Sequence, residues 1–340
     1  MTTAAPPYRP RDFASDQQVR WCPGCGDYAI LHVVQSVFAS LGIPREQFVV
    51  VSGIGCASRL PYYLETYGFH TLHGRAPAIA TGLALTRPEL SVWIVTGDGD
   101  ALSIGGNHLI HCLRRNVGVK ILLFNNQVYG LTKGQYSPTS PRGMVSGSTP
   151  FGSVDAPLDP LRLALGAGAT FVARTVDVLT RHLEEVLRAA ATHRGAAFVE
   201  IYQNCNIFND GAFDPLAGRD VRHDALVELH HGAPLRFGKD LDKGIVLTGA
   251  PLPAPVVATV AEVGEAALLV HDAHRDDATL AFLLAGMAAP ALPVPIGIFR
   301  QVERPRFEEG VAEQISAAIR RQGPGDLAAL LAGPETWEVE

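Results

Sequence analysis

The sequence contains few cysteines and no concentration of charge. Only five of its 340 residues are cysteine, too few for a disulfide scaffold in a chain long enough to bury a core without cross-links. The formal net charge is −6 and no block of like charges occurs, so a nucleic-acid-binding surface is not expected. Hydrophobic residues make up 47% of the chain and charged residues 18%, which is typical of a folded globular protein.

Long apolar segments of the kind that enter or cross a membrane are also scarce. Residues 1–20 form a polar N-terminal arm with prolines at positions 6, 7 and 10 and no apolar core. No secretory signal is therefore expected, and we predict a cytoplasmic protein without a membrane partner. The one long uncharged stretch, 278–299, has three prolines in its second half, which would break a spanning helix. We interpret it as a short buried helix followed by an extended segment.

Apolar runs that alternate with helical patterns indicate the fold. Five runs are mainly apolar and do not alternate with polar residues, as in strands buried on both faces of a parallel sheet. The runs cover 48–52, 91–96, 119–124, 170–173 and 197–202. Helical periodicity separates them, for example over 27–41 and 76–86. We therefore predict an α/β, doubly wound, mainly parallel sheet over residues 21–210. Residues 211–340 carry no comparable motif and are expected to form a C-terminal extension.

Glycine-rich or polar segments follow three of the predicted strands, where ligands of such sheets bind. The carboxylate of Asp98 and the amide of Asn126, with a backbone carbonyl just beyond, could supply Mg²⁺ with oxygen ligands, and a diphosphate could fill the remaining positions. Taken alone, a Gly-Asp-Gly segment is more often an ordinary turn. The Gly53-x-Gly55 pattern lacks the third glycine of a dinucleotide fingerprint, so we discard that interpretation.

Four of the five cysteines come from three separate segments. Cys22 and Cys25 form a Cys-x-x-Cys pair, Cys56 follows the first glycine-rich turn, and Cys205 stands alone. Four thiolates are suitable ligands for an iron–sulfur cluster or for zinc. A zinc site of two knuckles would need a second close pair, but the spacing alone leaves both metals open. Cys112 lies in a predicted helix and is expected to pack in the core.

Taken together, these motifs resemble the β subunit of a 2-oxoacid:ferredoxin oxidoreductase. Gly97-Asp98-Gly99, followed by 25 residues and then Asn125-Asn126, matches the thiamine-diphosphate motif. The similarity covers roughly residues 15–245 and includes four further motifs in the order of the family. These are Trp21-Cys22-Pro23-Gly24-Cys25-Gly26, Gly53-Ile54-Gly55-Cys56, His73-Gly74-Arg75 and Tyr129-Gly130-Leu131-Thr132-Lys133-Gly134-Gln135-Tyr136-Ser137-Pro138-Thr139.

The resemblance implies two metal sites and one organic cofactor. It implies a [4Fe–4S] cluster held by the four cysteines Cys22, Cys25, Cys56 and Cys205. It implies Mg²⁺ bound by Asp98, Asn126 and the main-chain carbonyl of Val128. Thiamine diphosphate is expected to contact a wider set of residues. That set consists of Ile54, Gly55, Ala57, His73, Gly97, Asp98, Gly99, Asp100, Asn126, Val128, Gly130, Leu131 and Thr132.

The resemblance also implies an activity and partners. The family carries out the thiamine-dependent oxidative decarboxylation of a 2-oxoacid to acyl-CoA and CO₂, and electrons pass through the cluster to ferredoxin. The glutamate that activates the cofactor comes from another chain in this family. We therefore expect an α subunit that carries the pyrimidine-side domain, in an αβ or (αβ)₂ assembly.

Three residues are candidates for contact with the substrate: Arg59, His73 and Leu131. A guanidinium at position 59 would pair with a distal carboxylate, which favours 2-oxoglutarate over the alternatives, pyruvate or another 2-oxoacid. Two other functions compete with this prediction. One is a non-redox thiamine decarboxylase with structural zinc, and the other is an electron-transfer module with a degenerate thiamine fold.

Overall fold

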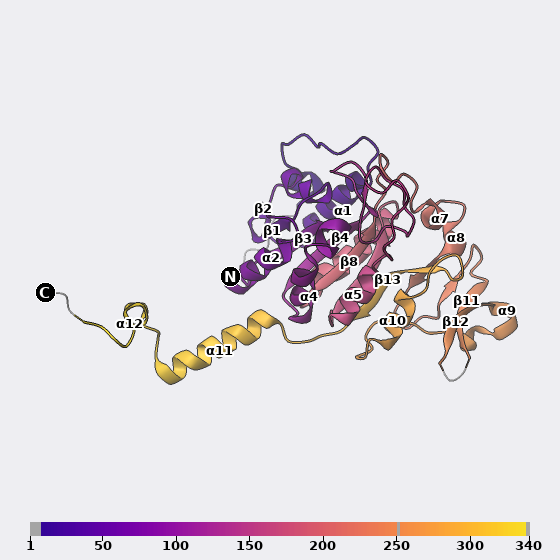
Figure 1. Ribbon diagram of the computed structural model, residues 1–340. Helices are drawn as coiled ribbons and strands as arrows, with labels where there is room; N and C mark the ends of the chain where they lie inside the picture. Colours follow the sequence, from indigo (N-terminus) through magenta and orange to yellow (C-terminus); the bar gives the residue numbers. More distant parts are fainter. Residues whose placement is uncertain (1–7, 250–251, 338–340) are drawn as a thin grey trace.

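The computed structural model describes residues 8–249 and 252–337, and its centre is an eight-stranded sheet (Figure 1). The strand order is β2-β1-β3-β4-β8-β7-β13-β9. The strands are β1 (Phe48–Ser52), β2 (Tyr67–His70), β3 (Ser91–Gly97), β4 (Val119–Asn125), β7 (Phe171–Val176), β8 (Ala197–Tyr202), β9 (Leu226–Leu229) and β13 (Val294–Gln301). The first six strands in this order run parallel, whereas β13 is antiparallel to β7. The predicted mainly parallel α/β sheet is confirmed.

Helices cover both faces of this sheet, which explains the continuous apolar runs. Successive residues of a strand point to opposite faces. In β1, Val49 and Val51 therefore join one core cluster, and Phe48 and Val50 join the other. On the first face lie α2 (Ala76–Thr86), α4 (Gly106–Arg114), α5 (Pro160–Gly166) and α10 (Thr279–Ala285). On the second face lie α1 (Asp27–Ser40) and α6 (Thr180–Thr192).

All five predicted strands are present, but both edge strands of the sheet, β2 and β9, were missed. β2 pairs with β1 at the edge of the sheet, and all four of its residues are exposed. An exposed edge strand needs no apolar run, so the apolar pattern gave no signal for it. The segment 278–299 forms the short helix α10 and then enters β13, as predicted.

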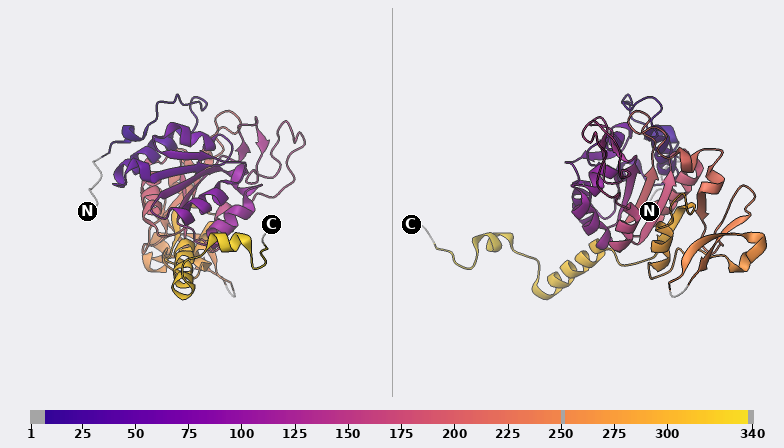
Figure 2. Two further views of the ribbon diagram at one scale, coloured as in Figure 1. Left: turned by 90° about the vertical axis from the view of Figure 1, so that its left-hand side faces the viewer. Right: turned by 45° about the vertical axis from the view of Figure 1, so that its right-hand side comes forward.

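The chain after residue 210 continues the sheet and adds two further parts. Strands β9 and β13 join the principal sheet, so the sheet crosses the domain boundary that we predicted at 210, and the boundary itself stays a prediction. A small antiparallel sheet consists of β10 (Arg236–Phe237), β11 (Lys243–Thr248) and β12 (Ala254–Thr259). Helices α11 (Phe307–Gln322) and α12 (Leu327–Ala332) form an arm that projects from the body (Figures 1 and 2).

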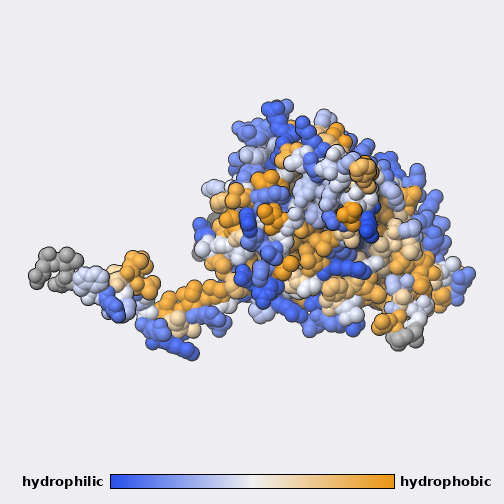
Figure 3. All heavy atoms as spheres, in the orientation of Figure 1, coloured by the Kyte–Doolittle hydropathy of each residue, from blue (hydrophilic) through white to orange (hydrophobic). Residues whose placement is uncertain are grey.

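Apolar side chains gather along one side of this arm (Figure 3). Ile315 and Ile319 of α11 and the leucines of α12 are exposed.

The remaining short elements are η1 (Pro10–Phe13), η2 (Arg45–Gln47), η3 (Ala57–Tyr63), α3 (Asp98–Leu102), β5 (Val128–Tyr129), β6 (Gln135–Tyr136), α7 (Asp214–Ala217), α8 (Arg222–Ala225), α9 (Val260–Val263) and η4 (Glu265–Ala267). Within the described ranges, no helix is both long enough and apolar enough to span a membrane. Residues 1–7 of the predicted N-terminal arm lie outside the described residues.

Candidate active site

The predicted site residues gather at the carboxyl edge of the parallel strands. In the register of β3 and β4, Gly97 lies opposite Phe124, so Asp98 follows one strand next to Asn125 at the end of the other. β1 is the neighbour of β3 on its other side, which brings the loop at Gly53 to the same edge. Ligands of open α/β sheets bind at this edge, and the predicted motifs therefore meet in one place.

Asp98 is buried at the start of α3 and is held by two hydroxyl groups. Its side chain is 2% exposed. Its Oδ2 atom accepts hydrogen bonds from Ser137 Oγ at 2.5 Å and from Thr139 Oγ1 at 2.6 Å. Burial raises the pKa of this carboxyl to about 6, because a buried charge lacks the solvation of water. A cation at this carboxylate would offset that cost, so the environment fits a metal ligand.

The two neighbouring asparagines have different surroundings. Asn125 is buried, and its Nδ2 donates to Glu200 Oε1 at 2.7 Å, away from the loops. Asn126 is half-buried, and its Oδ1 accepts from the backbone N–H of Val128 at 3.1 Å. An amide oxygen has two lone pairs, so Asn126 Oδ1 can bind a cation as well. This arrangement fits Asn126, rather than Asn125, as the predicted magnesium ligand.

Asp100 organises the loops around the site. Its Oδ1 accepts from the backbone N–H of Ile54 at 3.1 Å and of Gly74 at 2.7 Å, and its Oδ2 accepts from Thr96 Oγ1 at 2.7 Å. His73 Nδ1 also contacts this carboxylate. A buried carboxylate would repel a diphosphate, so a cofactor contact at position 100 would have to come from the backbone. The contact of Asp100 with the cofactor stays a prediction.

Three glycines in these loops are favoured by close packing or by a positive φ. A Cβ atom at Gly99 would lie 2.2 Å from the ring of Tyr129, whose hydroxyl donates to the Gly99 carbonyl at 3.0 Å. At Gly53 a Cβ atom would lie 1.8 Å from Asp100 Oδ2. At Gly55, with φ +126°, nothing lies within 4 Å of the Cβ position. The Gly55 backbone therefore faces an open space, as a loop that binds a phosphate needs.

The four predicted cluster ligands lie near one another beside this space. A Cβ atom on Gly130 would lie 3.5 Å from Cys205 Sγ and 3.7 Å from Cys56 Sγ. Burial raises the pKa of the Cys56 thiol to about 11; the charge of Asp27, and after it those of Cys205 and Cys22, add to the effect. Burial also raises the pKa of Cys25. The cysteines are unpaired and placed by three different segments of the chain.

The arrangement of these thiols bears on which metal they could hold. Among the described residues, no three His, Cys, Asp or Glu side chains converge as a single metal ion requires. Four thiols fit the ligand set of an iron–sulfur cluster and that of zinc, so the cluster stays a prediction here. Cys112 is 2% exposed and packs in the core under the sheet, as the sequence predicted.

The other predicted site residues have individual placements. His73 presents its ring edge-on to Tyr129, with 6.4 Å between ring centroids. Arg59 Nη1 donates to the carbonyl of Arg20 at 2.9 Å, which ties it to the Cys22 loop. Ala57 is buried in η3, and Leu131 is 43% exposed. Thr132 lies on the same exposed turn and bonds to Gln135. A substrate contact by Arg59, His73 or Leu131 stays a prediction.

Sequence reasoning missed Gln203, which connects the two halves of the site. Its Oε1 accepts from Asn126 Nδ2 at 3.0 Å, and its Nε2 donates to Cys25 Sγ at 3.2 Å. Gln203 is 1% exposed and directly follows β8. Its position at the carboxyl end of a strand next to β4 is a signal that could have identified it.

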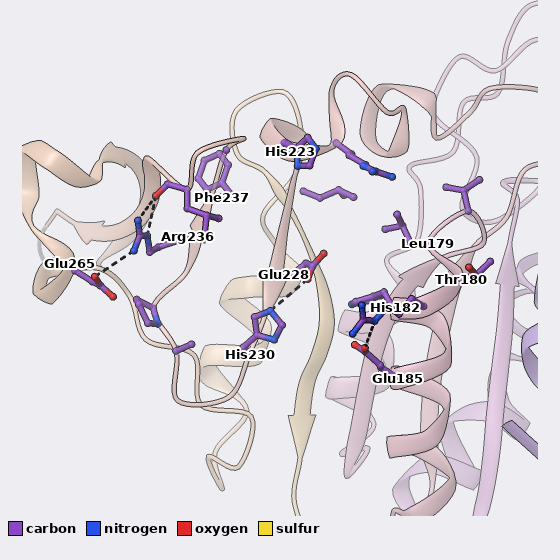
Figure 4. A pocket seen from close by; sticks show the side chains of 18 residues that line it. Leu179, Thr180, His182, Glu185, His223, Glu228, His230, Arg236, Phe237 and Glu265 are labelled. Atoms are coloured by element: carbon purple, nitrogen blue, oxygen red, sulfur yellow. Dashed lines mark hydrogen bonds and ion pairs between the residues drawn. The ribbon is translucent and has the colours of Figure 1, made fainter. Parts of the chain in front are cut away.

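A separate cleft of about 940 Å³ lies between α6 and the small sheet (Figure 4). His182 and Glu185 line it from α6, and Glu228 and His230 line it from the opposite side. His230 Nε2 lies 3.6 Å from Glu228 Oε2. None of the predicted site residues lines this cleft.

Comparison with known proteins identifies relatives of this chain. The family described as "Thiamine pyrophosphate enzyme, C-terminal TPP binding domain" matches residues 53–201. The chain is 55% identical to 2-oxoglutarate oxidoreductase subunit KorB of Mycobacterium tuberculosis over 99% of this chain and 90% of that protein. It is 44% identical to 2-oxoglutarate synthase subunit KorB of Archaeoglobus fulgidus over 54% of this chain and 69% of that protein.

A solved structure shows the same architecture. It is the 2-oxoglutarate:ferredoxin oxidoreductase of Magnetococcus marinus with 2-oxoglutarate, coenzyme A and succinyl-CoA bound. The TM-score is 0.75 with 33% sequence identity, and the match covers 96% of each chain. The thiamine-binding motifs at the sheet edge and the long match to these relatives lead to one conclusion: the chain belongs to the family of 2-oxoacid:ferredoxin oxidoreductase β subunits.

Proposed function

We propose that this chain supplies the thiamine-binding and cluster-binding half of an enzyme that oxidises 2-oxoglutarate with coenzyme A to succinyl-CoA and CO₂ and passes electrons to ferredoxin. The observation that carries the proposal is the meeting of Asp98, Asn126 and four cysteines at one edge of the sheet. The choice of 2-oxoglutarate is supported by the names of the M. tuberculosis and A. fulgidus relatives and by the ligands of the M. marinus structure.

Several of this chain's groups fit the proposed cofactors. Asp98, Asn126 and the carbonyl of Val128 would hold Mg²⁺, and the open backbone at Gly55 would accept the diphosphate. Thiamine diphosphate, when bound, supplies the electron sink that makes loss of CO₂ from a 2-oxoacid possible. The thiolates would hold a [4Fe–4S] cluster, which accepts single electrons.

The loop from residue 53 to 56 serves both cofactor sites. Gly55 faces the open space of the thiamine site, and the next residue, Cys56, lies among the cysteines. Gln203 adds a second connection through its contacts with Asn126 and Cys25. Electrons released in the thiamine site would therefore have a short route to the cluster, which supports a redox function over a non-redox decarboxylase.

An apolar rim around the site supports the need for an α subunit. Ile54, Leu72, Ile104 and Leu131 are 42%, 75%, 54% and 43% exposed. Ile104 packs next to Gly74, so this rim is continuous with the loops of the site. Exposed apolar patches mark surfaces that another chain covers. We propose that an α subunit closes the site there, in an αβ or (αβ)₂ assembly in the cytoplasm.

A panel of 2-oxoacids tests the proposed activity. The chain is co-expressed with its α subunit and assayed anaerobically with coenzyme A and a low-potential dye as acceptor. We expect the highest kcat/KM with 2-oxoglutarate and no dye reduction by the chain alone. A preference for pyruvate would contradict the proposed substrate. Decarboxylation without dye reduction, by a colourless protein that contains zinc, would support the non-redox alternative.

A further inference from the structure

We propose that Ser137 and Thr139 are positioning residues that reserve one oxygen of Asp98 for a cation, so that this carboxylate binds through a single oxygen and favours Mg²⁺ over Ca²⁺. The inference rests on the proposed function, because it takes Asp98 as a metal ligand. Both residues belong to the Ser-Pro-Thr segment after β6, which has no assigned role in the site.

Both hydroxyl groups approach the same carboxylate oxygen. Ser137 Oγ lies 2.5 Å and Thr139 Oγ1 lies 2.6 Å from Asp98 Oδ2. Ser137 is 2% and Thr139 4% exposed, so water does not compete for these bonds. A carboxylate oxygen offers about two lone-pair directions, and the two donors use both of them on Oδ2. The backbone N–H groups of Gly99 and Asp98 also approach this carboxyl. In the described part of the chain, however, no side-chain donor reaches Oδ1, so Oδ1 keeps lone-pair capacity for a cation.

The hydroxyl proton of Thr139 has one favourable destination. Thr139 Oγ1 lies 2.9 Å from Asn125 Oδ1 as well as 2.6 Å from Asp98 Oδ2. The backbone N–H of Gln127 already donates to Asn125 Oδ1 at 3.2 Å. Hydrogen bonds to a charged acceptor are the shorter and stronger ones. The Thr139 proton therefore goes to Asp98.

The hydroxyl proton of Ser137 is directed by Ser140. Ser140 Oγ accepts from the backbone N–H of Ser137 at 2.7 Å and donates its own proton to the Gln127 carbonyl at 2.6 Å. The contact between Ser137 Oγ and Ser140 Oγ, at 3.3 Å, is longer than either bond. Ser137 is thus fixed by its backbone, and its hydroxyl proton is free for Asp98.

A buried ion pair in the sheet anchors this arrangement. Glu200 Oε1 holds Asn125 Nδ2 at 2.7 Å, and Glu200 Oε2 lies 2.7 Å from Arg174 Nε. Arg174 is 4% and Glu200 0% exposed. The side chain of Asn125 cannot rotate without breaking its hydrogen bond to Glu200. Asn125 is therefore a fixed neighbour of Thr139. Fixed neighbours of this kind orient metal ligands in proteins.

The geometry of the carboxylate decides which cation it suits. Mg²⁺ requires near-ideal octahedral coordination, whereas Ca²⁺ accepts more ligands and often takes both oxygens of a carboxylate. With Oδ2 occupied by two donors, Asp98 can offer Oδ1 alone. Loss of a donor would free Oδ2 and make binding through both oxygens accessible. The ratio of Mg²⁺-supported to Ca²⁺-supported cofactor binding therefore reports the role of the hydroxyl groups.

Calorimetric titration of the cofactor-free αβ complex with thiamine diphosphate, in Mg²⁺ or in Ca²⁺, tests the inference. In Thr139→Val and in Ser137→Ala we expect affinity in Mg²⁺ to fall roughly tenfold, as for loss of a hydrogen bond to a charged group. Affinity in Ca²⁺ should change by less than about threefold, because Ca²⁺ gains the freed oxygen. Thr139→Ser should restore the wild-type ratio. Thr175→Val, which removes a buried hydroxyl bonded to His182, is the matched control and should leave both affinities unchanged.

The possible outcomes separate the inference from the proposed function. Equal losses in both metals, with Thr139→Ser no better than Thr139→Val, would show a role in folding alone and overturn the inference. An unchanged ratio of Mg²⁺-supported to Ca²⁺-supported affinity in every variant would also overturn the inference. If Thr139→Val fails to fold, Ser137→Ala, which adds no bulk, still provides the test. A wild-type complex that binds no thiamine diphosphate with either metal would overturn the proposed function itself, and the inference with it.

Discussion

Asn126 and Gln203 share a hydrogen bond of 3.0 Å between Nδ2 and Oε1, and the amide nitrogen of Gln203 donates to the Cys25 thiol at 3.2 Å. One buried side chain therefore connects a proposed magnesium ligand with a proposed cluster ligand. The two sites are parts of one structural unit at the carboxyl edge of the sheet. Through this connection, the proposed cluster would be sensitive to a residue that binds no iron.

Gln203→Ala should make the reduction potential of the cluster more negative, by on the order of tens of millivolts. Reduction adds negative charge to the cluster, and an N–H group that donates to a cysteine sulfur stabilises that charge. A redox titration monitored by electron paramagnetic resonance measures the shift. Gln17→Ala, at an exposed position where the side chain donates to Asp16, is the control. Equal potentials in Gln203→Ala and wild type would contradict the assigned contact.

Cys205→Ala should lose or destabilise the cluster, whereas Cys112→Ala should keep it. Cys205 lies with Cys56 around Gly130, but Cys112 is packed among apolar side chains in the core. Iron and acid-labile sulfide analysis of both anaerobically purified variants provides the measurement. The reverse pattern, with iron lost from Cys112→Ala and kept in Cys205→Ala, would refute the ligand assignment.

Glu200→Gln should lower the free energy of unfolding by roughly 3–5 kcal/mol, because it leaves the buried Arg174 without its counter-charge. Unfolding by urea, followed by circular dichroism, measures the change. Glu185→Gln is the matched control, since its partner Arg181 is 95% exposed, and exposed pairs of this kind contribute about 0–1 kcal/mol. Similar losses in the two variants would show that the buried pair has no special role.

Arg59→Ala should lower kcat/KM for 2-oxoglutarate by one or more orders of magnitude and change pyruvate turnover little. Loss of one partner from a buried charged pair typically costs about 2–5 kcal/mol, and only the dicarboxylic substrate offers a second carboxylate. Steady-state kinetics with both substrates are compared. The bond from Arg59 to the Arg20 carbonyl supports a competing role in holding the cysteine loop. Equal losses for both substrates would favour that role.

The fold and the meeting of the candidate site residues at one sheet edge could be predicted because their signals are local. Strands buried on two faces need continuous apolar runs, so β1, β3, β4, β7 and β8 were all recognisable. The glycines at positions 53 and 99 have packing reasons that match their place in the motifs. The ligand candidates Asp98 and Asn126 follow directly from strands that prove to lie close together.

The contacts between distant segments could not be predicted. Gln203 and Thr139 contact Asn126 and Asp98 through tertiary interactions. The strand end before Gln203 marks its position, but neither residue type indicates which partner it contacts. Asp100 lies in the predicted motif, but its carboxylate binds loop N–H groups, a function that becomes visible only when the loops are placed. Strand β9 and the projecting arm have no motif, and their positions depend on packing alone.

The most direct test of the account is the addition of 2-oxoglutarate and coenzyme A to the oxidised, anaerobic αβ complex with thiamine diphosphate and Mg²⁺, while the visible absorption of the cluster is followed. We predict bleaching and formation of succinyl-CoA in wild type, and neither in Asp98→Ala, because that variant lacks the one charged ligand proposed for Mg²⁺. An Asp98→Ala complex that bleaches like wild type, or a wild-type complex without cluster absorption, would contradict the account.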